Sequence, residues 1–556
     1  MNRKNVLVSI VVLLFLFLSM LGSEPAVFVE AEEVTYSTGP SLDVVEISSV
    51  DGLIDGIYGV ANGTLDMLLE SSSWRVYKDL PQEVLENLTL VKAPSEIWSL
   101  VFNPVQNFYY DSETDVFLTL LNATAGFNNP NLTLLPGLVN TSSGEIHFNP
   151  FALRAVRYAM NWLISRRCIV ESILYGGGAL MYGPVGPSHP ADKYFRDLYP
   201  SMNLTAEGDI SRAVEMIEQA LIDANETLRR YGYYLYKRFY DTSPAGYWWI
   251  LHKPNDEEEL VNVTFYIRVE DERHEEGFYI ANLIEKYFGI RVNRVEEVFS
   301  KCVETVYYTD PAKYRWNIYT EGWRYFTTWL YPEWDIAYYY APWYGLLPGF
   351  QGGGWRYIND TIDDITWGVC HSVFANETDF WNKLREAVKL GIQESVRVFV
   401  AEIWTLFPVS KRVSNLVCDI TSGLWSGWTL RTADTPDHKL KVAHLRRSLG
   451  GSPLWSFHSP LSWWIWFSIS DYGRYVCPGI GDIIRCVHPR TGEVIPVRYC
   501  WDEPIEKNYE IDEQGNLVGY LSVDSDAVVY DSFTDVWVQA GEGVTAATKV
   551  VYHFNW

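Results

Sequence analysis

The stretch from Asn149 to Pro187 constrains the fold of this chain more than any other part of its sequence. Asn149 can cap a helix, and Pro150 suits the first helical turn, where its missing N–H group is not needed. Apolar residues then recur at helical spacing, at Phe151, Val156, Ala159, Met160, Leu163 and Ile164. Glycines and two Gly-Pro steps close the stretch between residues 176 and 187. The pattern predicts a helix with one buried face, followed by an extended loop.

Length and composition set wide limits on the fold and on the partners. A chain of 556 residues is too long for one ordinary core, which predicts two or three domains. The hydrophobic content of 48% and the charged content of 21% are those of a globular protein. Aromatic residues reach 15%, which suits either packed cores or a cleft where rings stack on a ligand. The formal net charge of −26 argues against a nucleic acid partner and against anionic membrane surfaces.

The N-terminus has the pattern of an export signal. Arg3 and Lys4 precede an apolar run from Val6 to Leu21, and Val29-Glu30-Ala31 offers a cleavage site with small residues. We therefore predict a signal peptide over residues 1–31 and a location outside the cell or on its surface. An uncleaved N-terminal anchor is the alternative. Glycosylation sequons fit export, at Asn62, Asn87, Asn122, Asn131, Asn140, Asn203, Asn225, Asn262, Asn359 and Asn376.

The cysteines and histidines give no sign of a metal site. The 7 cysteines include no C-x-x-C pair, and the 10 histidines are dispersed without the spacing of metal ligands. Cys477 and Cys486 flank a Pro-Gly-Ile-Gly turn and are the favoured disulfide pair, whereas Cys168 is expected to be a buried thiol. We predict no cofactor and no metal. Neither a Gly-x-Ser-x-Gly elbow nor a His-Glu-x-x-His motif is present, so the chain is not expected to be an enzyme.

Strands and helices are predicted to alternate through most of the chain, which indicates an α/β layer with parallel or mixed pairing. Beyond about residue 440 helical periodicity disappears, and Asp512 to Asn516 is the connection of a β-hairpin. The region 111–145 is predicted to be a long loop. The predicted strands are 42–50, 98–103, 261–269, 290–295, 314–319, 494–497, 517–523 and 527–530, and the predicted helices are 52–61, 211–230, 276–288 and 381–404.

Several of these segments resemble the extracellular solute-binding proteins of family 5, which are the oligopeptide- and dipeptide-binding proteins of ABC importers. The similarity is strongest over residues 149–187 and 261–345, and it includes the strand Trp98 to Asn103. The resemblance implies a two-lobed, periplasmic-binding-protein-like α/β fold of type II. The order of the segments is similar to that of the long archaeal branch of the family. Because the chain stops at Trp556 within an apparent strand, we expect a truncated member whose lobe I is incomplete at the C-terminus.

The resemblance also divides the chain. Residues 1–31 are the signal peptide, 32–145 are part of lobe I and the approach to the hinge, 146–428 are lobe II, and 429–556 are the remaining, β-rich part of lobe I. The helix after Asn149 would then open the second lobe.

The predicted ligand site follows a strand near residue 319. Gly322 permits a sharp exit from that strand, and ligands of open α/β sheets lie beyond the carboxyl ends of strands. Aromatic rings with a few charged groups suit a cleft for peptides or sugars, although an aromatic core strand is the alternative. In the family an Asp shortly after Gly-Trp meets the amino terminus of the peptide; here Arg324 and Tyr325 occupy that stretch, and Glu321 or Asp335 could substitute for it. The predicted ligand-binding residues are Tyr319, Glu321, Trp323, Arg324, Tyr325, Trp334, Asp335, Trp455 and Trp463. For Arg268, Asp271 and Arg273 we expect structural salt bridges near a strand end.

The function implied by the resemblance is that of the extracellular substrate-binding component of an ABC importer. It would capture oligopeptides or oligosaccharides by hinge closure and deliver them to the permease subunits in the membrane. Two alternatives stay open: a secreted glycoside hydrolase, which needs two carboxylates brought together in space, and an inactive or structural surface glycoprotein.

Overall fold

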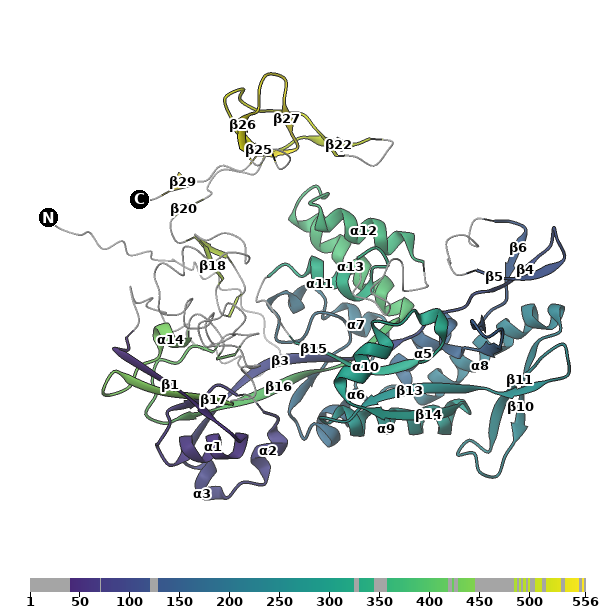
Figure 1. Ribbon diagram of the computed structural model, residues 1–556, viewed down its shortest axis with the longest axis horizontal. Helices are drawn as coiled ribbons and strands as arrows, with labels where there is room; N and C mark the ends of the chain where they lie inside the picture. The colour runs from purple at the N-terminus through teal and green to yellow at the C-terminus, as the bar shows by residue number, and fades with distance from the viewer. Residues whose placement is uncertain are drawn as a thin grey trace, which may run out of the picture. The chain divides into compact units, whose positions relative to one another are not determined.

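The computed structural model describes residues 41–554 (Figure 1), with gaps at 71, 121–128, 325–329, 345–357, 419–422, 425–428, 446–484, 488–489, 492–493, 497–498, 501–505, 513–516, 532–535 and 550–552. The predicted signal peptide and residues Trp455 and Trp463 lie outside the described part. Among the described residues, no helix combines the length and the apolar character that a membrane crossing requires.

One large mixed sheet organises the described chain, which confirms the predicted α/β class. Its strands run in the order β1-β17-β2-β16-β3-β15-β13-β14, and β9 (Gly178–Leu180) also pairs with β16. Pairing is parallel among the first three strands and among the last three, and antiparallel where β16 and β3 join them. The bounds are β1 Val44–Val50, β17 Lys439–Leu445, β2 Met67–Leu68, β16 Arg397–Ser410, β3 Leu88–Phe102, β15 Ile318–Arg324, β13 Asn262–Arg268 and β14 Arg291–Glu297.

Helices cover both faces of this sheet (Figure 1). Three short helices, α1 (Leu53–Ala61), α2 (Trp74–Lys78) and α3 (Gln82–Leu85), accompany β1, β17 and β2. α9 (Arg273–Leu283) packs on β13 and β14, whereas α11 (Glu333–Tyr340) lies on the other side of the sheet, above β15 in Figure 1. The other helices with several turns are α5 (Arg154–Leu163), α8 (Ile210–Leu228), α10 (Phe299–Val306), α12 (Asp360–Cys370) and α13 (Glu377–Glu394).

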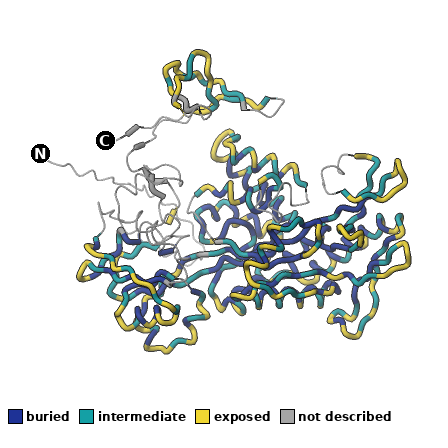
Figure 2. The backbone as a smooth tube through the Cα atoms, viewed as in Figure 1, coloured by how far each residue is buried: buried dark blue, intermediate teal, exposed yellow. Residues whose placement is uncertain are grey.

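The apolar interior is divided. A large core gathers the second half of β3, the first half of β16 and the helices between them in sequence, and we call this part the large body. Two smaller clusters lie on β1, β17, β2 and the other halves of β3 and β16, and we call this part the small body. Buried residues lie in the interior of both bodies (Figure 2). The two cores meet near residues 94–97 and 403–406, which is earlier along the chain than the predicted lobe boundaries at 145 and 428.

β3 and β16 therefore connect the two bodies. Their antiparallel register shifts twice, between Phe399 and Ala401 and between Ile403 and Trp404. The second shift coincides with the place where the cores meet, and the strand residues there are only half-buried. Because a β-bulge disrupts the ladder and bends the strand, this is a weakened point of the connection.

The Asn149 motif folds as its residues predict. The Asn149 side chain accepts a hydrogen bond from the Phe151 N–H at 3.2 Å, and Pro150 occupies the first turn of a short 3₁₀ helix that leads into α5. The same side chain donates to the backbone oxygens of Asn103 and Val105 at 2.9 and 3.0 Å, and accepts from Asn317 at 3.1 Å. Asn149 is thus a buried junction between β3, β15 and α5.

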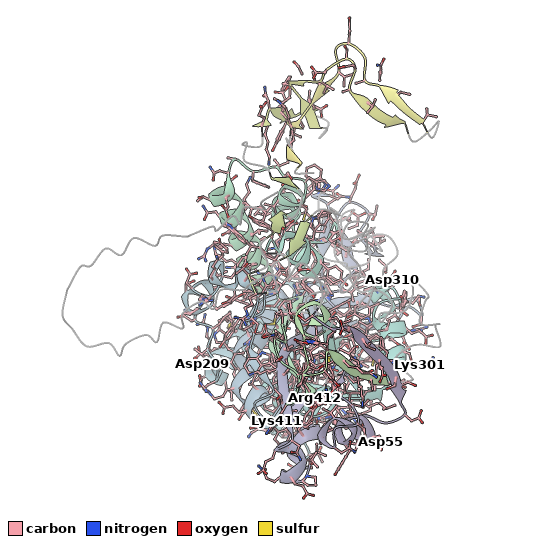
Figure 3. All side chains as sticks on the ribbon, turned by 90° about the vertical axis from the view of Figure 1, so that its left-hand side faces the viewer. Asp55, Asp209, Lys301, Asp310, Lys411 and Arg412 are labelled. Atoms are coloured by element: carbon pink, nitrogen blue, oxygen red, sulfur yellow. The ribbon has the colours of Figure 1, made fainter. Side chains whose placement is uncertain are left out.

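Acidic side chains stabilise helix and strand ends in both bodies, and Figure 3 labels Asp209 and Arg412, which take part in two of these contacts. Asp209 caps α8 by accepting from the Arg212 N–H at 3.0 Å. In the small body, the buried Asp66 accepts from Arg412 Nη1 at 3.2 Å and from the Lys441 N–H at 2.8 Å. These contacts tie the end of β16 to β2 and β17.

Three predicted elements differ from the structure. The strand predicted at 314–319 begins only at Ile318, and it continues through Gly322 to Arg324 as β15. The predicted helix 381–404 is wrong in its second half, because α13 ends at Glu394, Ser395 adopts a left-handed conformation with φ 48°, and β16 begins at Arg397. The predicted loop 111–145 instead contributes to hairpins that involve β4 (Phe108–Asp111), β5 (Val116–Thr119), β6 (Leu132–Leu134), β7 (Leu138–Asn140) and β8 (Ile146–Phe148).

The C-terminal region is composed of short antiparallel pairs, as predicted. β22 (Tyr509–Ile511) pairs with β23 (Leu517–Gly519), which confirms a hairpin around Asp512. Among the described cysteines, Cys168, Cys302 and Cys370 are free thiols; Cys168 is half-buried and Cys302 is fully buried. The favoured pair Cys477–Cys486 includes a residue outside the described part and stays a prediction.

Candidate functional site

The predicted site segment divides between the interior and the surface. Tyr319 and Glu321 lie on β15 with exposed fractions of 2% and 1%, inside the large core. Because side chains alternate along a strand, Tyr319, Glu321 and Trp323 share one face of the sheet, and Gly322 points to the other. The two faces carry different chemistry and are described in turn.

Glu321 is engaged on both of its carboxylate oxygens. Oε2 accepts hydrogen bonds from Ser99 Oγ and from Arg397 Nε, both at 2.7 Å, and Oε1 accepts from Arg397 Nη2 at 2.9 Å and from the Tyr307 hydroxyl. Burial alone would raise the pKa of Glu321, but the charge and hydrogen bonds of Arg397 hold it below its usual range. Arg397 also donates to the Tyr339 carbonyl at 2.9 Å. This carboxylate is a structural anchor between β15, β3 and β16.

Trp323 begins a chain of aromatic rings that leads from this core to the surface. Its ring centroid lies 5.8 Å from Tyr307 and 5.0 Å from Tyr338 on α11. Further contacts connect Trp334, Tyr344, Trp343 and His371, with centroids between 5.0 and 6.4 Å apart. Trp334 and Tyr344 are 42% and 40% exposed, so the outer rings of the chain are open to ligands.

Carboxyl groups lie among these rings. Glu333 and Asp335 belong to the first turn of α11, and Asp363 on α12 accepts from the Trp343 N–H at 3.1 Å. Burial raises the pKa of Glu333 to about 7 and that of Asp363 to about 6. Asp335 is reached by solvent, yet the protein crowded around it raises its pKa to about 6 as well. Solvent access decides what can bind, so Asp335 is the most available of the three.

Neither Glu333 nor Asp335 has a basic partner among the described residues, and the Glu333 Oε2 atom is buried without a hydrogen bond. A carboxylate without a basic partner is stabilised by the ammonium or guanidinium group of a ligand. Exposed rings add stacking and cation–π attraction. The set Trp323, Trp334, Tyr338, Trp343, Tyr344 and His371 with Glu333, Asp335 and Asp363 is called the aromatic–carboxyl surface below.

The opposite face of the strand ends carries a cluster of ion pairs. Arg268, the last residue of β13, pairs with Glu270 at 2.8 Å and with Asp271 at 3.8 Å, and Arg273 Nε donates to Asp271 at 2.7 Å. The expected structural salt bridges of Arg268, Asp271 and Arg273 are therefore confirmed.

Gly322 is part of the same arrangement. A Cβ atom at this position would lie 1.9 Å from Arg273 Nη1, so the guanidinium occupies the space that a side chain would need. The Arg273 guanidinium also lies 5.0 Å from the centroid of the Trp98 ring.

Four predicted site residues cannot be placed with their side chains. Arg324 ends β15 opposite Glu96, but its side chain lies outside the described part. Tyr325, Trp455 and Trp463 lie outside it altogether. Their roles stay predictions.

Sequence reasoning missed most of the aromatic–carboxyl surface. Glu333, Tyr338, Trp343, Tyr344, His371 and Asp363 were not among the predicted site residues, although the run from Pro332 to Tyr344 is unusually aromatic. Acidic residues directly after a proline at a helix start are a general signal for an N-terminal turn. That signal identifies a helix but gives no sign of the rings that α12 adds.

No group of residues within the described chain has the arrangement of a metal site. Comparison with protein-family models gave no match, and comparison with curated proteins gave none either.

Among solved structures, the chain is similar to the oligopeptide-binding protein of Bacillus subtilis in complex with a nonapeptide, with a TM-score of 0.42 and 13% identity over 68% of this chain and 58% of that chain. It is also similar to a periplasmic oligopeptide-binding protein of an ABC transporter from Thermotoga maritima, with a TM-score of 0.46 and 12% identity over 69% and 61%. A third similar structure is the protein NikZ of Campylobacter jejuni in complex with Ni(L-His). Its TM-score is 0.40, and the identity is 12% over 66% of this chain and 56% of that chain. The chain thus spans less than two thirds of the length of each of these proteins.

Proposed function

We propose that this chain is the substrate-binding component of an ABC importer outside the cell, and that it captures oligopeptides in preference to oligosaccharides. The observation that carries the proposal is the aromatic–carboxyl surface, where exposed rings surround carboxyl groups that have no basic partner among the described residues. Such a set of groups can bind a cationic, amine-bearing ligand such as a peptide. A neutral sugar would use the rings and leave the carboxylates unpaired.

The architecture supports capture by closure. Two bodies with separate cores are joined through β3 and β16, and the ladder is disrupted where the cores meet. Bodies joined in this way can rotate as units about a few residues, which is the structural basis of hinge closure. In the proposal the large body is lobe II and the small body is part of lobe I, and permease subunits in the membrane receive the ligand.

The proposal is tested by isothermal titration of the full chain with a pool of random tetrapeptides, with the same pool acetylated at its amino groups, and with maltotriose. We expect binding of the free peptides, weakening of about tenfold or more on acetylation, and no binding of the sugar. Equal binding of the acetylated pool would overturn the amine preference. Binding of the sugar alone would replace peptides with oligosaccharides.

Mass spectrometry of material that co-purifies with the native protein provides an independent measurement. Peptides in that material would support the proposal. Hydrolysis of an oligosaccharide by the purified chain would instead support the glycoside hydrolase alternative.

A further inference from the structure

A second contact joins the two bodies, apart from β3 and β16. Ser73 Oγ donates a hydrogen bond to Glu272 Oε1 at 2.8 Å, and Arg75 Nη1 donates to Glu275 Oε1 at 2.8 Å. These four residues are called the clasp. Ser73 and Arg75 belong to the start of α2, and Glu272 and Glu275 to the start of α9, about 200 residues further along the chain.

Each half of the clasp is fixed in its own body. On the small-body side, Tyr77 of α2 is fully buried, and its hydroxyl donates to the Leu406 carbonyl at 3.2 Å. On the large-body side, Arg273 follows Glu272 directly and is held by Asp271 and by its position over Gly322. Each half of the clasp therefore keeps its position within its own body.

The contact extends beyond the four residues. Lys78 Nζ lies 3.9 Å from the centroid of the Tyr175 ring, which belongs to the large body. A Cβ atom on Gly177 would lie 3.9 Å from the Cβ of Trp74, so α2 also approaches the loop after residue 174. Both ends of α2, at Trp74 and Lys78, thus approach the large body.

The clasp and the aromatic–carboxyl surface lie on opposite faces of the sheet. α9 is on the face that Gly322 and Trp98 present, whereas Trp323 points to the face that α11 covers. Figure 1 shows α9 below β13 and β14, and α11 above β15. Because the clasp joins the two bodies on one face of the sheet, the bodies can move apart on the opposite face.

We propose that the clasp acts as a fixed edge, about which the two bodies rotate, so that the gap between them opens and closes on the face of the aromatic–carboxyl surface. This inference rests on the proposed capture by hinge closure and adds its direction. The clasp stays intact in the open and in the closed state. Its release would let the bodies separate on both faces.

Charge reversal tests the clasp by hydrogen exchange of the ligand-free full chain. Arg75→Glu places two acidic groups together, and we expect amide exchange to rise about two- to fivefold in residues 72–78 and 271–276. The swap Arg75→Glu with Glu275→Arg should restore the wild-type rates. Arg167→Glu is the matched control, since Arg167 is exposed to a similar extent and pairs with Glu171 within the large body at 3.1 Å. Unchanged exchange in Arg75→Glu would overturn the clasp.

Exchange with and without the pool of random tetrapeptides tests the direction of closure. We expect protection in residues 333–344 and no change in residues 72–78 and 271–276. A change of exchange in the clasp on peptide binding would overturn the inference and leave the proposed function standing. A third outcome is that Arg75→Glu raises amide exchange in the clasp while peptides change no exchange anywhere. The clasp would then remain a contact between the bodies, but the proposed function and the closure that rests on it would both be overturned.

Discussion

Glu321 and Asp335 are carboxylates of one short segment, yet they differ in burial and in hydrogen bonding. Glu321 is buried and receives hydrogen bonds from Ser99, Tyr307 and Arg397. Asp335 is open to solvent and has no basic partner among the described residues. The pKa of Glu321 is lowered and that of Asp335 is raised to about 6. A carboxylate whose oxygens are hydrogen-bonded inside the protein stabilises the fold, whereas a carboxylate without a partner at the surface is available to a ligand.

Glu321→Ala gives the largest expected effect, because it leaves the Arg397 guanidinium buried and unpaired. We expect a loss of about 3–5 kcal/mol in the free energy of unfolding, measured by urea denaturation. The double variant Glu321→Leu with Arg397→Met removes both charges and should recover most of that loss. Equal losses in the single and the double variant would show that the pair is not what stabilises this region.

Glu276 on α9 is an intermediate case, since it is fully buried and both of its carboxylate oxygens lack hydrogen bonds. Burial raises its pKa from 4.5 to about 8, while Arg273 opposes and Asp271 reinforces the shift. A raised pKa in the folded state means that the proton stabilises the fold. The contribution is complete below pH 4.5 and is lost as the pH rises through about 8.

The loss should amount to roughly 3–4 kcal/mol between pH 5 and pH 8. Glu276→Gln should remove this part of the pH dependence of unfolding, which thermal denaturation across that range would detect. Glu171→Gln, an exposed change in the same body, is the control. A pH profile that is identical in wild type and Glu276→Gln would contradict the assignment.

Asn149 is a neutral side chain that is hydrogen-bonded inside the protein, and we expect it to stabilise the fold as well. Asn149→Ala removes a helix cap and leaves the backbone oxygens of Asn103 and Val105 without a donor. We expect a cost of about 2–3 kcal/mol in stability. Asn255→Ala, on an exposed turn where Asn255 accepts from the Glu257 N–H at 3.2 Å, should cost much less. Similar costs in the two variants would argue against the junction.

The smallest effect is expected where the rule predicts ligand binding and little contribution to folding. Trp334→Ala and Asp335→Asn should each weaken binding of the tetrapeptide pool about tenfold, which corresponds to about 1–2 kcal/mol. The melting temperature should hardly change, and Asp335→Asn should rather raise it. Phe239→Ala is the control, because Phe239 is 88% exposed on another part of the large body. Weaker binding of equal size in the control would exclude a specific site.

Local patterns were sufficient for much of the fold. The helix predicted at 211–230 is α8, the strand predicted at 261–269 is β13, and the capping role of Asn149 is confirmed. The helix predicted through residue 404 failed because Val396 and Val400 fit helical spacing and strand burial equally well. Only the left-handed Ser395 separates α13 from β16, and no single-residue pattern announces it.

The site was harder to predict than the fold, for a physical reason. Glu321 owes its role to Arg397, which is 76 residues away in sequence and on a different strand. The rings around Trp334 likewise come from α11, α12 and the turn after residue 340. Residue types can suggest that a segment is rich in binding chemistry. Which of its groups are already engaged depends on the tertiary structure.

The crossing of β3 and β16 has a consequence for how the molecule can be taken apart. The chain passes from the small body to the large body along β3 and comes back along β16. At this crossing, Ile97 pairs with Glu402 and Ile403 pairs with Glu96. The large body is therefore a single cassette whose two ends lie side by side in the sheet. The segment between these two ends can be replaced by the corresponding segment of a similar protein. The small body would then be kept, while the groups of the large body that contact a ligand would change.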